Sequence, residues 1–290
     1  MPGTGLIASL IDRCTFPPRG APARLAVSGG ADSVAMMVLA IEAGCVVEVH
    51  HVDHHIRPES GADARFVADL CGRLGLPFTL HDVDVPLGPN LEARLREARF
   101  VGLPADVLTG HTADDQVETI LLNLMRGAGL DGLSGMREIG HPILRLRRSE
   151  TEAVCAEFGV TPMVDASNTD RAFRRNQVRL DLIPLMNSIA QRDVVSIISR
   201  QAESLRDDAD FLHDLGRSID PTDAKALVDA PVVMARRALR AWLSTEHPPD
   251  AAAIERVLAV ARGEVIGADV GAGVRVRRTN NRLRIESDGQ

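Results

Sequence analysis

The chain has 290 residues, 45% of them hydrophobic and 25% charged, which gives enough length for one large domain plus a smaller one and an ordinary globular composition. The longest apolar stretch, residues 34–47, is interrupted by Glu42 and Gly44, and no basic segment leads into an apolar run at the N-terminus. The sequence therefore predicts neither a membrane span nor a secretory signal. The net charge of −7 argues against a uniformly basic surface for nucleic acid.

Arginine dominates the cations, since Lys225 is the only lysine among the 33 basic residues. Guanidinium groups suit bidentate contacts to phosphate and stacking on bases. A GC-rich genome would enrich arginine in the same way, so its distribution along the chain matters more than its count. The shortage of lysine excludes a Walker A loop, which needs a Gly-Lys-Ser/Thr sequence.

The four cysteines are scattered along the chain without a CxxC pair: Cys14, Cys45, Cys71 and Cys155. In a chain without a predicted export signal, we expect reduced core thiols rather than disulfides, a metal site or a redox centre. We therefore expect a cytoplasmic location.

Strand and helix patterns alternate along the first part of the chain. The expected strands cover residues 24–27, 45–51, 77–85 and 106–109. The expected helices cover residues 32–43, 59–74, 91–100 and 113–125. This alternation predicts the α/β class, with a doubly wound, mostly parallel, Rossmann-like sheet and helices on both faces.

The pattern changes after about residue 180. Helical periodicity without strand signals covers residues 192–216, 237–243 and 251–261. The tail, residues 265–285, alternates and contains Asn280-Asn281, which is typical of a tight hairpin. We predict a first domain of residues 1–184 and a smaller, mainly helical domain of residues 185–290 with a terminal β-hairpin.

The first candidate site is the turn SGGADS (28–33) between the first expected strand and its helix. Its two glycines let backbone N–H groups approach an anion, and the following helix directs its positive end to the same place. The expected nucleotide ligands are Ser28, Gly29, Gly30, Ala31, Asp32 and Ser33. Asp32 would repel phosphate unless Mg²⁺ lies between them. The alternative is a plain turn in which Asp32 caps the helix.

A second candidate site is GHTADDQVET (110–119), at the end of the fourth expected strand. His111, Asp115 and Glu118 fall on one face of the helix that starts there. Because adjacent parallel strands deliver their carboxyl ends to one crevice, we expect Asp115 to share a Mg²⁺ ion with Asp32. His111 would donate to a phosphate or position the reacting base.

Ordinary structural roles are the alternatives for some of these residues. Acids at a helix start interact with the helix dipole, in which case Asp114 and Glu118 would simply be solvated. The histidines of residues 50–55 invite a zinc interpretation. Neighbours along a strand point to opposite faces, so we expect only one or two of them to border a nucleotide pocket.

Arginines outside the two loops supply the remaining candidates. Arg99, on an expected helix without an evident partner, is a candidate nucleotide ligand and equally an ordinary surface residue. Arg126 stands near the start of a glycine-rich stretch, residues 125–136, for which a flexible loop is the default interpretation and a position over ATP or against tRNA is the alternative. The motif of residues 165–179 gathers Arg171, Arg174, Arg175 and Arg179. Such a group is typical of a phosphate-binding surface, with a solvated helix as the alternative.

Six stretches together resemble the tRNA(Ile)-lysidine synthase family of PP-loop ATP pyrophosphatases. In the family's order they are SGGADS (28–33), HVDHHIRPES (51–60), NLEARLREARF (90–100), GHTADDQVET (110–119), RGAGLDGLSGM (126–136) and DASNTDRAFRRNQVR (165–179). The resemblance implies a ligase in which ATP adenylates O2 of the wobble cytidine in the CAU anticodon of tRNA(Ile). Free L-lysine then displaces AMP at C2, which changes codon specificity from AUG to AUA.

The resemblance also implies roles for particular residues. Asp32 and Asp115 would hold Mg²⁺ or orient the lysine ammonium, His111 would stabilise the transition state, and Arg175 would contact the adenylate. The residues expected to bind tRNA are Arg126, Arg171, Arg174 and Arg179. The chain resembles the family's short form, in which the arginines of the tail would help to hold tRNA. A homodimer is left open.

Two alternatives remain at this point. A tRNA 2-thiocytidine synthetase shares the PP-loop but typically uses cysteine pairs, which this chain lacks. The other alternative is a nucleotide-binding or tRNA-binding module without turnover, which the presence of Asp32, His111 and Asp115 disfavours.

Overall fold

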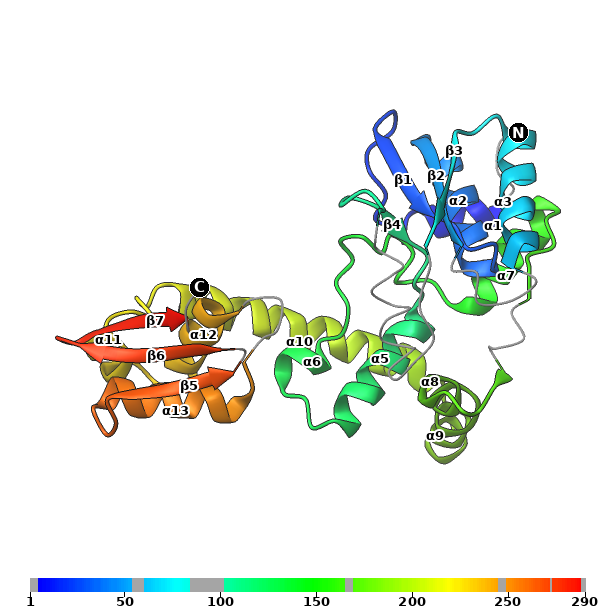
Figure 1. The fold of residues 1–290 in the computed structure, drawn as a ribbon. Coiled ribbons are helices and arrows are strands. Elements are labelled where there is room, and N and C mark those ends of the chain that lie inside the picture. Colours follow the sequence, from blue (N-terminus) through cyan, green and yellow to red (C-terminus); the bar gives the residue numbers. More distant parts are fainter. Residues whose placement is uncertain are drawn as a thin grey trace. The chain divides into compact units, whose positions relative to one another are not determined.

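The computed structural model describes residues 5–53, 60–83, 102–164, 169–244, 249–271 and 273–287. The chain divides into two compact units, Met1–Glu203 and Ser204–Gln290, and the division falls inside one long helix, α10 (Val194–Arg217). Figure 1 shows a parallel sheet in the N-terminal part and a small antiparallel sheet made by the last strands of the chain.

The first unit is built on a parallel sheet of four strands in the order β3-β2-β1-β4. The strands are β1 (Pro22–Ala26), β2 (Val46–Asp53), β3 (Phe78–Asp82) and β4 (Leu108–Thr109). Ala26, at the end of β1, pairs with Thr109 on one side and with His50 on the other. The carboxyl ends of β1 and β4 therefore lie next to each other, and so do the loops that follow them.

The helices of the first unit are α1 (Gly5–Ile11), α2 (Ala31–Glu42), α3 (Ser60–Leu74), α5 (Ala113–Met125), α6 (Leu130–Leu133), α7 (Arg148–Phe158), α8 (Arg174–Gln177), the short π-helical segment η2 (Val178–Leu182) and α9 (Ile183–Ala190). Helix α2 is apolar on all sides, and its residues from Val34 to Ala40 are fully buried. Such a helix must be covered on every face. It packs against α7 and the sheet, so α7 is held beside the start of α2.

A second apolar cluster explains where the first unit ends. It joins Val117 and Leu121 of α5 with Val178, Ile183 and Val195 of the helices that follow. These contacts tie α9 and the start of α10 to the first unit. The division therefore falls at Glu203/Ser204 instead of residue 184, where the change in sequence pattern suggested it.

The second unit has its own core and a three-stranded antiparallel sheet in the order β5-β6-β7. Its helices are α11 (Ala224–Asp229), α12 (Val232–Leu243) and α13 (Ala251–Arg262), and its strands are β5 (Gly267–Gly271), β6 (Val274–Thr279) and β7 (Arg282–Ser287). Asn280 and Asn281 both adopt positive φ, at 49° and 61°, as a tight turn between two strands requires. The expected hairpin is therefore present, and β5 adds a third strand to it.

The predicted fold class is confirmed. The expected helix of residues 91–100 lies outside the described residues. Helices α1, α6, α7, α9 and α11 had no counterpart among the expected elements, and α7 carries residues of the candidate site. Among the described helices, none combines the length and the apolar character that crossing a membrane would require.

Candidate active site

The loop between β1 and α2 has the geometry of an anion-binding turn. Gly29 adopts φ +94°, a conformation that favours glycine. The Ser33 hydroxyl donates to the Gly30 carbonyl at 2.9 Å and accepts the Ser28 N–H at 3.1 Å, so the loop is braced by its own residues. The first N–H groups of α2 have no intrahelical acceptor and point out of its start.

Asp32 does not cap this helix. The N-cap of α2 is Gly30, without a side-chain cap hydrogen bond, so the capping alternative is wrong. The Asp32 carboxylate accepts the Thr151 hydroxyl and lies 3.3 Å from the Arg148 Nε, both from α7. Burial raises the pKa of Asp32, although Thr151 and Arg148 act in the opposite direction.

Gly110 explains how the second loop approaches the first. A Cβ atom at this position would lie 2.9 Å from the Asp32 carbonyl oxygen and 3.0 Å from the Ser33 Cα. Any larger residue would push the loop away from the first turn of α2. The glycine before His111 is therefore required by the contact between the two predicted motifs.

Asp115 uses its two carboxylate oxygens for different purposes. Its Oδ2 accepts the backbone N–H of Thr112 at 3.0 Å and the Thr112 hydroxyl at 2.9 Å, which closes the start of α5. Its Oδ1 lies 3.1 Å from the Arg148 Nη2. Burial alone would raise the pKa of Asp115, but the guanidiniums of Arg148 and Arg175 outweigh it and the pKa is lowered.

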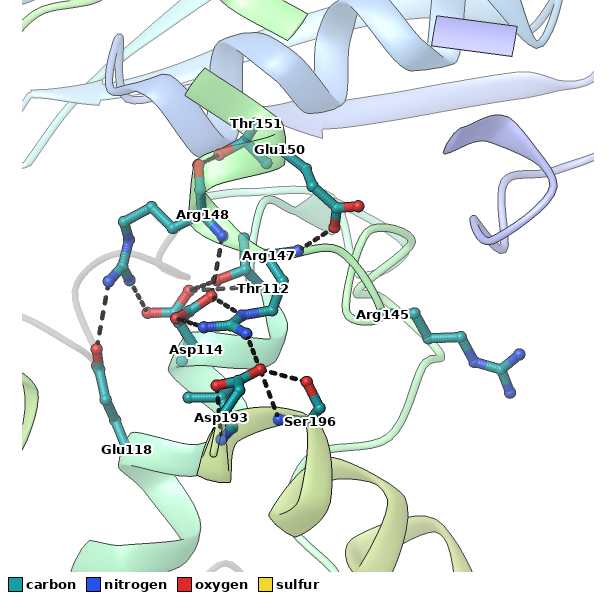
Figure 2. Close-up of polar contacts among 12 residues, drawn as sticks. Thr112, Asp114, Glu118, Arg145, Arg147, Arg148, Glu150, Thr151, Asp193 and Ser196 are labelled. Carbon is teal, nitrogen blue, oxygen red and sulfur yellow. Dashed lines mark hydrogen bonds and ion pairs between the residues drawn. The ribbon is translucent and has the colours of Figure 1, made fainter. Parts of the chain in front are cut away.

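Arg148 is the residue that joins the two motifs, and the sequence analysis missed it. Its guanidinium contacts Asp32 and Asp115 and also lies 3.5 Å from the Glu118 Oε1. Figure 2 shows it reaching from the start of α7 toward Glu118 on α5. These carboxylates outweigh the burial and raise the pKa of Arg148 further above its ordinary value.

Glu118 is a fully buried carboxylate. Its side chain has 0% exposure, and it accepts the Arg175 Nε at 2.7 Å and the Arg179 Nε at 2.6 Å. The interpretation of Glu118 as a solvated helix-start acid is therefore wrong. The three carboxylates Asp32, Asp115 and Glu118, together with the guanidiniums of Arg148, Arg175 and Arg179, form what we call the charged cluster.

Asp114, the other acid for which simple solvation was the alternative, fixes the start of α7. It pairs with Arg147 through both oxygens, each 3.1 Å from a guanidinium nitrogen, and accepts the Arg148 backbone N–H at 2.9 Å. Arg147 also pairs with Asp193, next to α10 (Figure 2). The sequence feature that could have predicted this helix start is Glu150, because a Glu at the third helical position often accepts the N–H of the N-cap residue. Here it accepts the Arg147 N–H at 2.7 Å.

The charged cluster contains the carboxylates that could bind a metal ion. Asp32 and Asp115 both face one cationic group, the guanidinium of Arg148. Within the described part of the chain, no group of three or more His, Cys, Asp or Glu side chains is arranged to hold a metal ion. Two carboxylates still fit Mg²⁺, which commonly takes one or two carboxylates and completes its shell with phosphate and water oxygens.

The histidines near the carboxyl edge of the sheet have different partners. His51 Nδ1 lies 2.7 Å from the Val27 carbonyl oxygen, directly before the loop between β1 and α2, whereas His50 Nδ1 lies 3.0 Å from His81 Nε2. Both neighbours on β2 are buried. His111 Nδ1 lies 2.8 Å from the Thr109 hydroxyl oxygen, which the His141 ring also contacts.

The arginines predicted to bind tRNA separate into two groups. Arg126, at the end of α5, and Arg171 and Arg174 are exposed, and Arg171 pairs with Asp181 at 2.9 Å. Arg179 instead joins Arg175 in the charged cluster. Arg99 lies outside the described residues.

Comparison with known proteins adds independent findings. The family model described as a PP-loop domain matches residues 15–186. The chain is 39% identical over 236 residues to the tRNA(Ile)-lysidine synthase of Rhodococcus erythropolis, covering 76% of this chain and 73% of that protein. It is 36% identical over 281 residues to the tRNA(Ile)-lysidine synthase of Nocardia farcinica, covering 88% and 87%.

One solved structure supports the fold alone. The U34-tRNA thiolase NcsA from Methanococcus maripaludis, solved with its [4Fe-4S] cluster, matches with a TM-score of 0.53 at 15% sequence identity. The match covers 69% of this chain and 77% of that protein.

Proposed function

We propose that this chain, which belongs to the PP-loop family and within it to the tRNA(Ile)-lysidine synthases, ligates free L-lysine to C2 of the wobble cytidine in the CAU anticodon of tRNA(Ile). Family membership makes it an ATP-using, tRNA-modifying ligase. The substrates and the order of steps are the proposal. The observation that supports it most is the packing of Gly110 against the first turn of α2, which brings the phosphate loop and the Asp115 motif together.

In the first proposed step, O2 of the cytosine attacks the α-phosphorus of ATP and pyrophosphate leaves. The protein contributes mainly position and charge neutralisation to such a step. The backbone N–H groups of Gly29, Gly30 and Ala31, with the hydroxyls of Ser28 and Ser33, would hold the pyrophosphate. His111 would donate to the developing negative charge.

A Mg²⁺ ion would be held by Asp32 and Asp115. When bound, it supplies positive charge to the phosphate oxygens. Because Arg148 contacts both carboxylates, its guanidinium must give up or share these contacts, and it would then be available to the phosphates. The second role proposed for Asp32 and Asp115 is to orient the ammonium group of the lysine substrate.

In the second proposed step, the amine of lysine attacks C2, the C2–O bond breaks and AMP leaves. Arg175 would stay near the adenylate, since its Nη2 lies 3.3 Å from the Asp115 carbonyl oxygen and thus at the start of α5. The changed base would then pair with adenine, so that the codon read shifts from AUG to AUA. ATP, lysine and tRNA are all cytoplasmic, which agrees with the expected location.

We also propose that the second unit contacts tRNA through the outer face of its sheet. Arg275, Arg277 and Arg284 are exposed, and Arg277 pairs directly with Arg284 across β6 and β7. Like charges in directly opposite positions destabilise a sheet, and a phosphate group lying over them would relieve the repulsion. Arg126, Arg171 and Arg174 of the first unit are the other exposed candidates.

A sulfur-transferring PP-loop enzyme is the competing function. Such an enzyme needs reactive thiolates, and all four cysteines are free. Burial raises the pKa of Cys71 and of Cys155 to about 11, and that of Cys14 to about 12. These three thiols stay protonated at neutral pH, which disfavours a sulfur relay.

The test is AMP formation from ATP with tRNA(Ile) carrying a CAU anticodon, with and without lysine, and with methionine tRNA as a rival substrate. We expect AMP formation to require the isoleucine tRNA, and labelled lysine to enter that RNA. AMP without lysine incorporation would assign the enzyme to another PP-loop branch, and no AMP would contradict the proposed activity.

A further inference from the structure

We propose that Thr151 is a positioning residue, which holds one oxygen of the Asp32 carboxylate and so directs the other oxygen toward the cation that takes part in the reaction. The inference rests on the proposed function, which assigns a cation, Mg²⁺ or the lysine ammonium, to Asp32 and Asp115. Thr151 was not a candidate from the sequence. It lies on α7, a helix without a counterpart among the expected elements.

The Thr151 hydroxyl is buried against the Asp32 carboxylate. The residue has 0% exposure, and its Oγ1 lies 2.5 Å from Asp32 Oδ1. An ionised carboxylate only accepts, so the hydroxyl is then the donor, whereas a protonated carboxyl would donate to the hydroxyl. The Arg148 carbonyl, 2.8 Å from the same hydroxyl, is a second acceptor (Figure 2), but a charged acceptor makes the stronger bond. Thr151 therefore holds this oxygen of Asp32 in either protonation state.

Contacts on the C-terminal side of Thr151 fix α7 against the loop between β1 and α2. One turn further along the helix, the Cys155 thiol lies 3.4 Å from the Ala31 carbonyl oxygen. After the helix, the Met163 N–H donates to the Gly29 carbonyl at 3.0 Å. The buried residues of α7 also belong to the same apolar core as α2. Thr151 therefore reaches the carboxylate from a rigid support, as a positioning residue must.

The two carboxylates are anchored in the same manner. The Thr151 hydroxyl holds Oδ1 of Asp32. The hydroxyl and the N–H of Thr112 hold Oδ2 of Asp115. The remaining oxygens, Asp32 Oδ2 and Asp115 Oδ1, lie 3.3 and 3.1 Å from two nitrogens of the Arg148 guanidinium. Neutral donors thus hold one oxygen of each acid, and the other two oxygens face one cationic group.

This division of the oxygens separates the roles of Arg148 and Thr151. Arg148 has the same charge sign as a cation bound between the two carboxylates, so it must move or share its contacts when such a cation binds. Thr151 is neutral and contacts the other oxygen of Asp32, so its hydrogen bond can persist. Removing a group that holds a metal ligand in place typically costs about 10-fold to 100-fold in metal affinity or activity. Thr151 has the position and the chemistry of such a group.

The first test needs no substrate. It is the crystal structure of the full-length chain with Thr151→Val, a change that keeps the side-chain shape and removes the hydroxyl. We expect the Asp32 carboxylate to turn away from residue 151, with both oxygens toward Arg148. Thr151→Ser retains a hydroxyl and should keep the wild-type orientation.

An Asp32 carboxylate that keeps its wild-type orientation in Thr151→Val would overturn the inference. If the valine variant does not fold, Thr151→Ala removes the same hydroxyl and is judged by the same outcome.

The second test measures the Mg²⁺ concentration for half-maximal AMP formation and the KM for lysine. In Thr151→Val we expect one of the two values to rise at least about tenfold, which identifies the cation, and Thr151→Ser should restore it. Thr112→Val should give a smaller rise, because the Thr112 N–H still holds Asp115. Ser149→Ala is the matched control, since Ser149 is exposed on the same helix, and both values should stay within about twofold.

A merely structural role for Thr151 would lower stability and leave both values unchanged, and that result would overturn the inference. The two tests also separate the inference from the proposed function. Failure of the wild-type chain to form AMP would contradict the proposed function, whereas the structure of Thr151→Val would still decide whether Thr151 holds Asp32.

Discussion

The molecule contains two arginine-rich regions that use the same side chain in opposite ways. In the charged cluster, Glu118 has 0% side-chain exposure, and the guanidiniums around it are neutralised by carboxylates of the protein itself. On the outer face of the C-terminal sheet, the Arg277 side chain is 54% exposed, and its Nη1 lies 3.9 Å from the carboxylate of Glu286, which is itself exposed. The count of arginines therefore does not tell where RNA binds. The decisive property is whether each arginine already has a buried counter-ion.

The largest expected effect comes from removing the buried counter-ion. Glu118→Ala leaves the guanidiniums of Arg175 and Arg179 without their carboxylate, and removing one partner of a buried ion pair typically destabilises a protein by about 3–5 kcal/mol. We expect a loss of that size in the free energy of unfolding, measured with urea. Glu286→Ala, the matched change on the exposed sheet, should cost less than about 1 kcal/mol. Equal losses for the two variants would remove the distinction between the regions.

The next effect concerns catalysis. Arg148→Ala leaves Asp32 and Asp115 without their shared counter-ion and removes a cation from the place where we propose that the phosphates bind. We expect the rate of AMP formation to fall roughly a hundredfold, as for other charge-stabilising groups. Arg145→Ala is the control, because this neighbour is 52% exposed and points away from the cluster (Figure 2). A rate within threefold of wild type for Arg148→Ala would show that the cluster is only structural.

A smaller effect is expected on the exposed face. The double variant Arg277→Ala/Arg284→Ala should weaken tRNA binding about tenfold, and the slope of log Kd against log salt should flatten by roughly 1–2 units. The exposed Arg236, which pairs with Glu255 at 2.6 Å, provides the control substitution Arg236→Ala. If tRNA affinity and its salt dependence are unchanged in the double variant, the sheet does not contact phosphate.

The smallest expected effect is on the pH dependence of stability, compared between Asp32 of the charged cluster and Asp220 of the second unit. Asp32 and Asp220 each lie beside an arginine, yet burial raises the pKa of Asp32. The exposed Asp220 has its pKa lowered to about 2 by Thr222 and then by Arg282. A group whose pKa is higher in the folded state stabilises the protein at pH values below its unfolded-state pKa. This stabilisation is lost as the pH rises through its folded-state pKa. A group whose pKa is lower in the folded state stabilises the protein at pH values above its unfolded-state pKa. This stabilisation is lost as the pH falls through its folded-state pKa.

The two Asn variants should therefore change stability in opposite directions. Asp32→Asn should be more stable than wild type at neutral pH, with the gain shrinking as pH falls below the folded pKa of Asp32. Asp220→Asn should be less stable at neutral pH, with the deficit disappearing as pH falls from about 4 toward about 2. Urea unfolding at several pH values measures both. The same sign for the two variants would contradict the assigned pKa directions.

The arginines of the tail show how far sequence reasoning reached. The five arginines of residues 275–284 look alike in sequence, but they separate in the structure. Arg278 donates to the Ala261 carbonyl at 2.7 Å and Arg282 pairs with Asp220 at 2.5 Å, so both stabilise the second unit. Arg275, Arg277 and Arg284 lie on the outer face of the sheet and are exposed. Likewise, Arg174 and Arg175 are neighbours, but only Arg175 reaches Glu118.

The sequence by itself determined the alternation of strands and helices along the first part of the chain, the glycine-containing turn between β1 and α2, and the start of α5 at Ala113. These features depend on local periodicity, on glycine and on the rule that parallel strands end at one edge. The tertiary structure alone decided that Glu118 is buried and that Arg148 and Thr151 of α7 complete the site around Asp32. It also placed His141 against Thr109. Such contacts join residues thirty or more positions apart, and they arise from packing between elements, which leaves no local pattern in the chain.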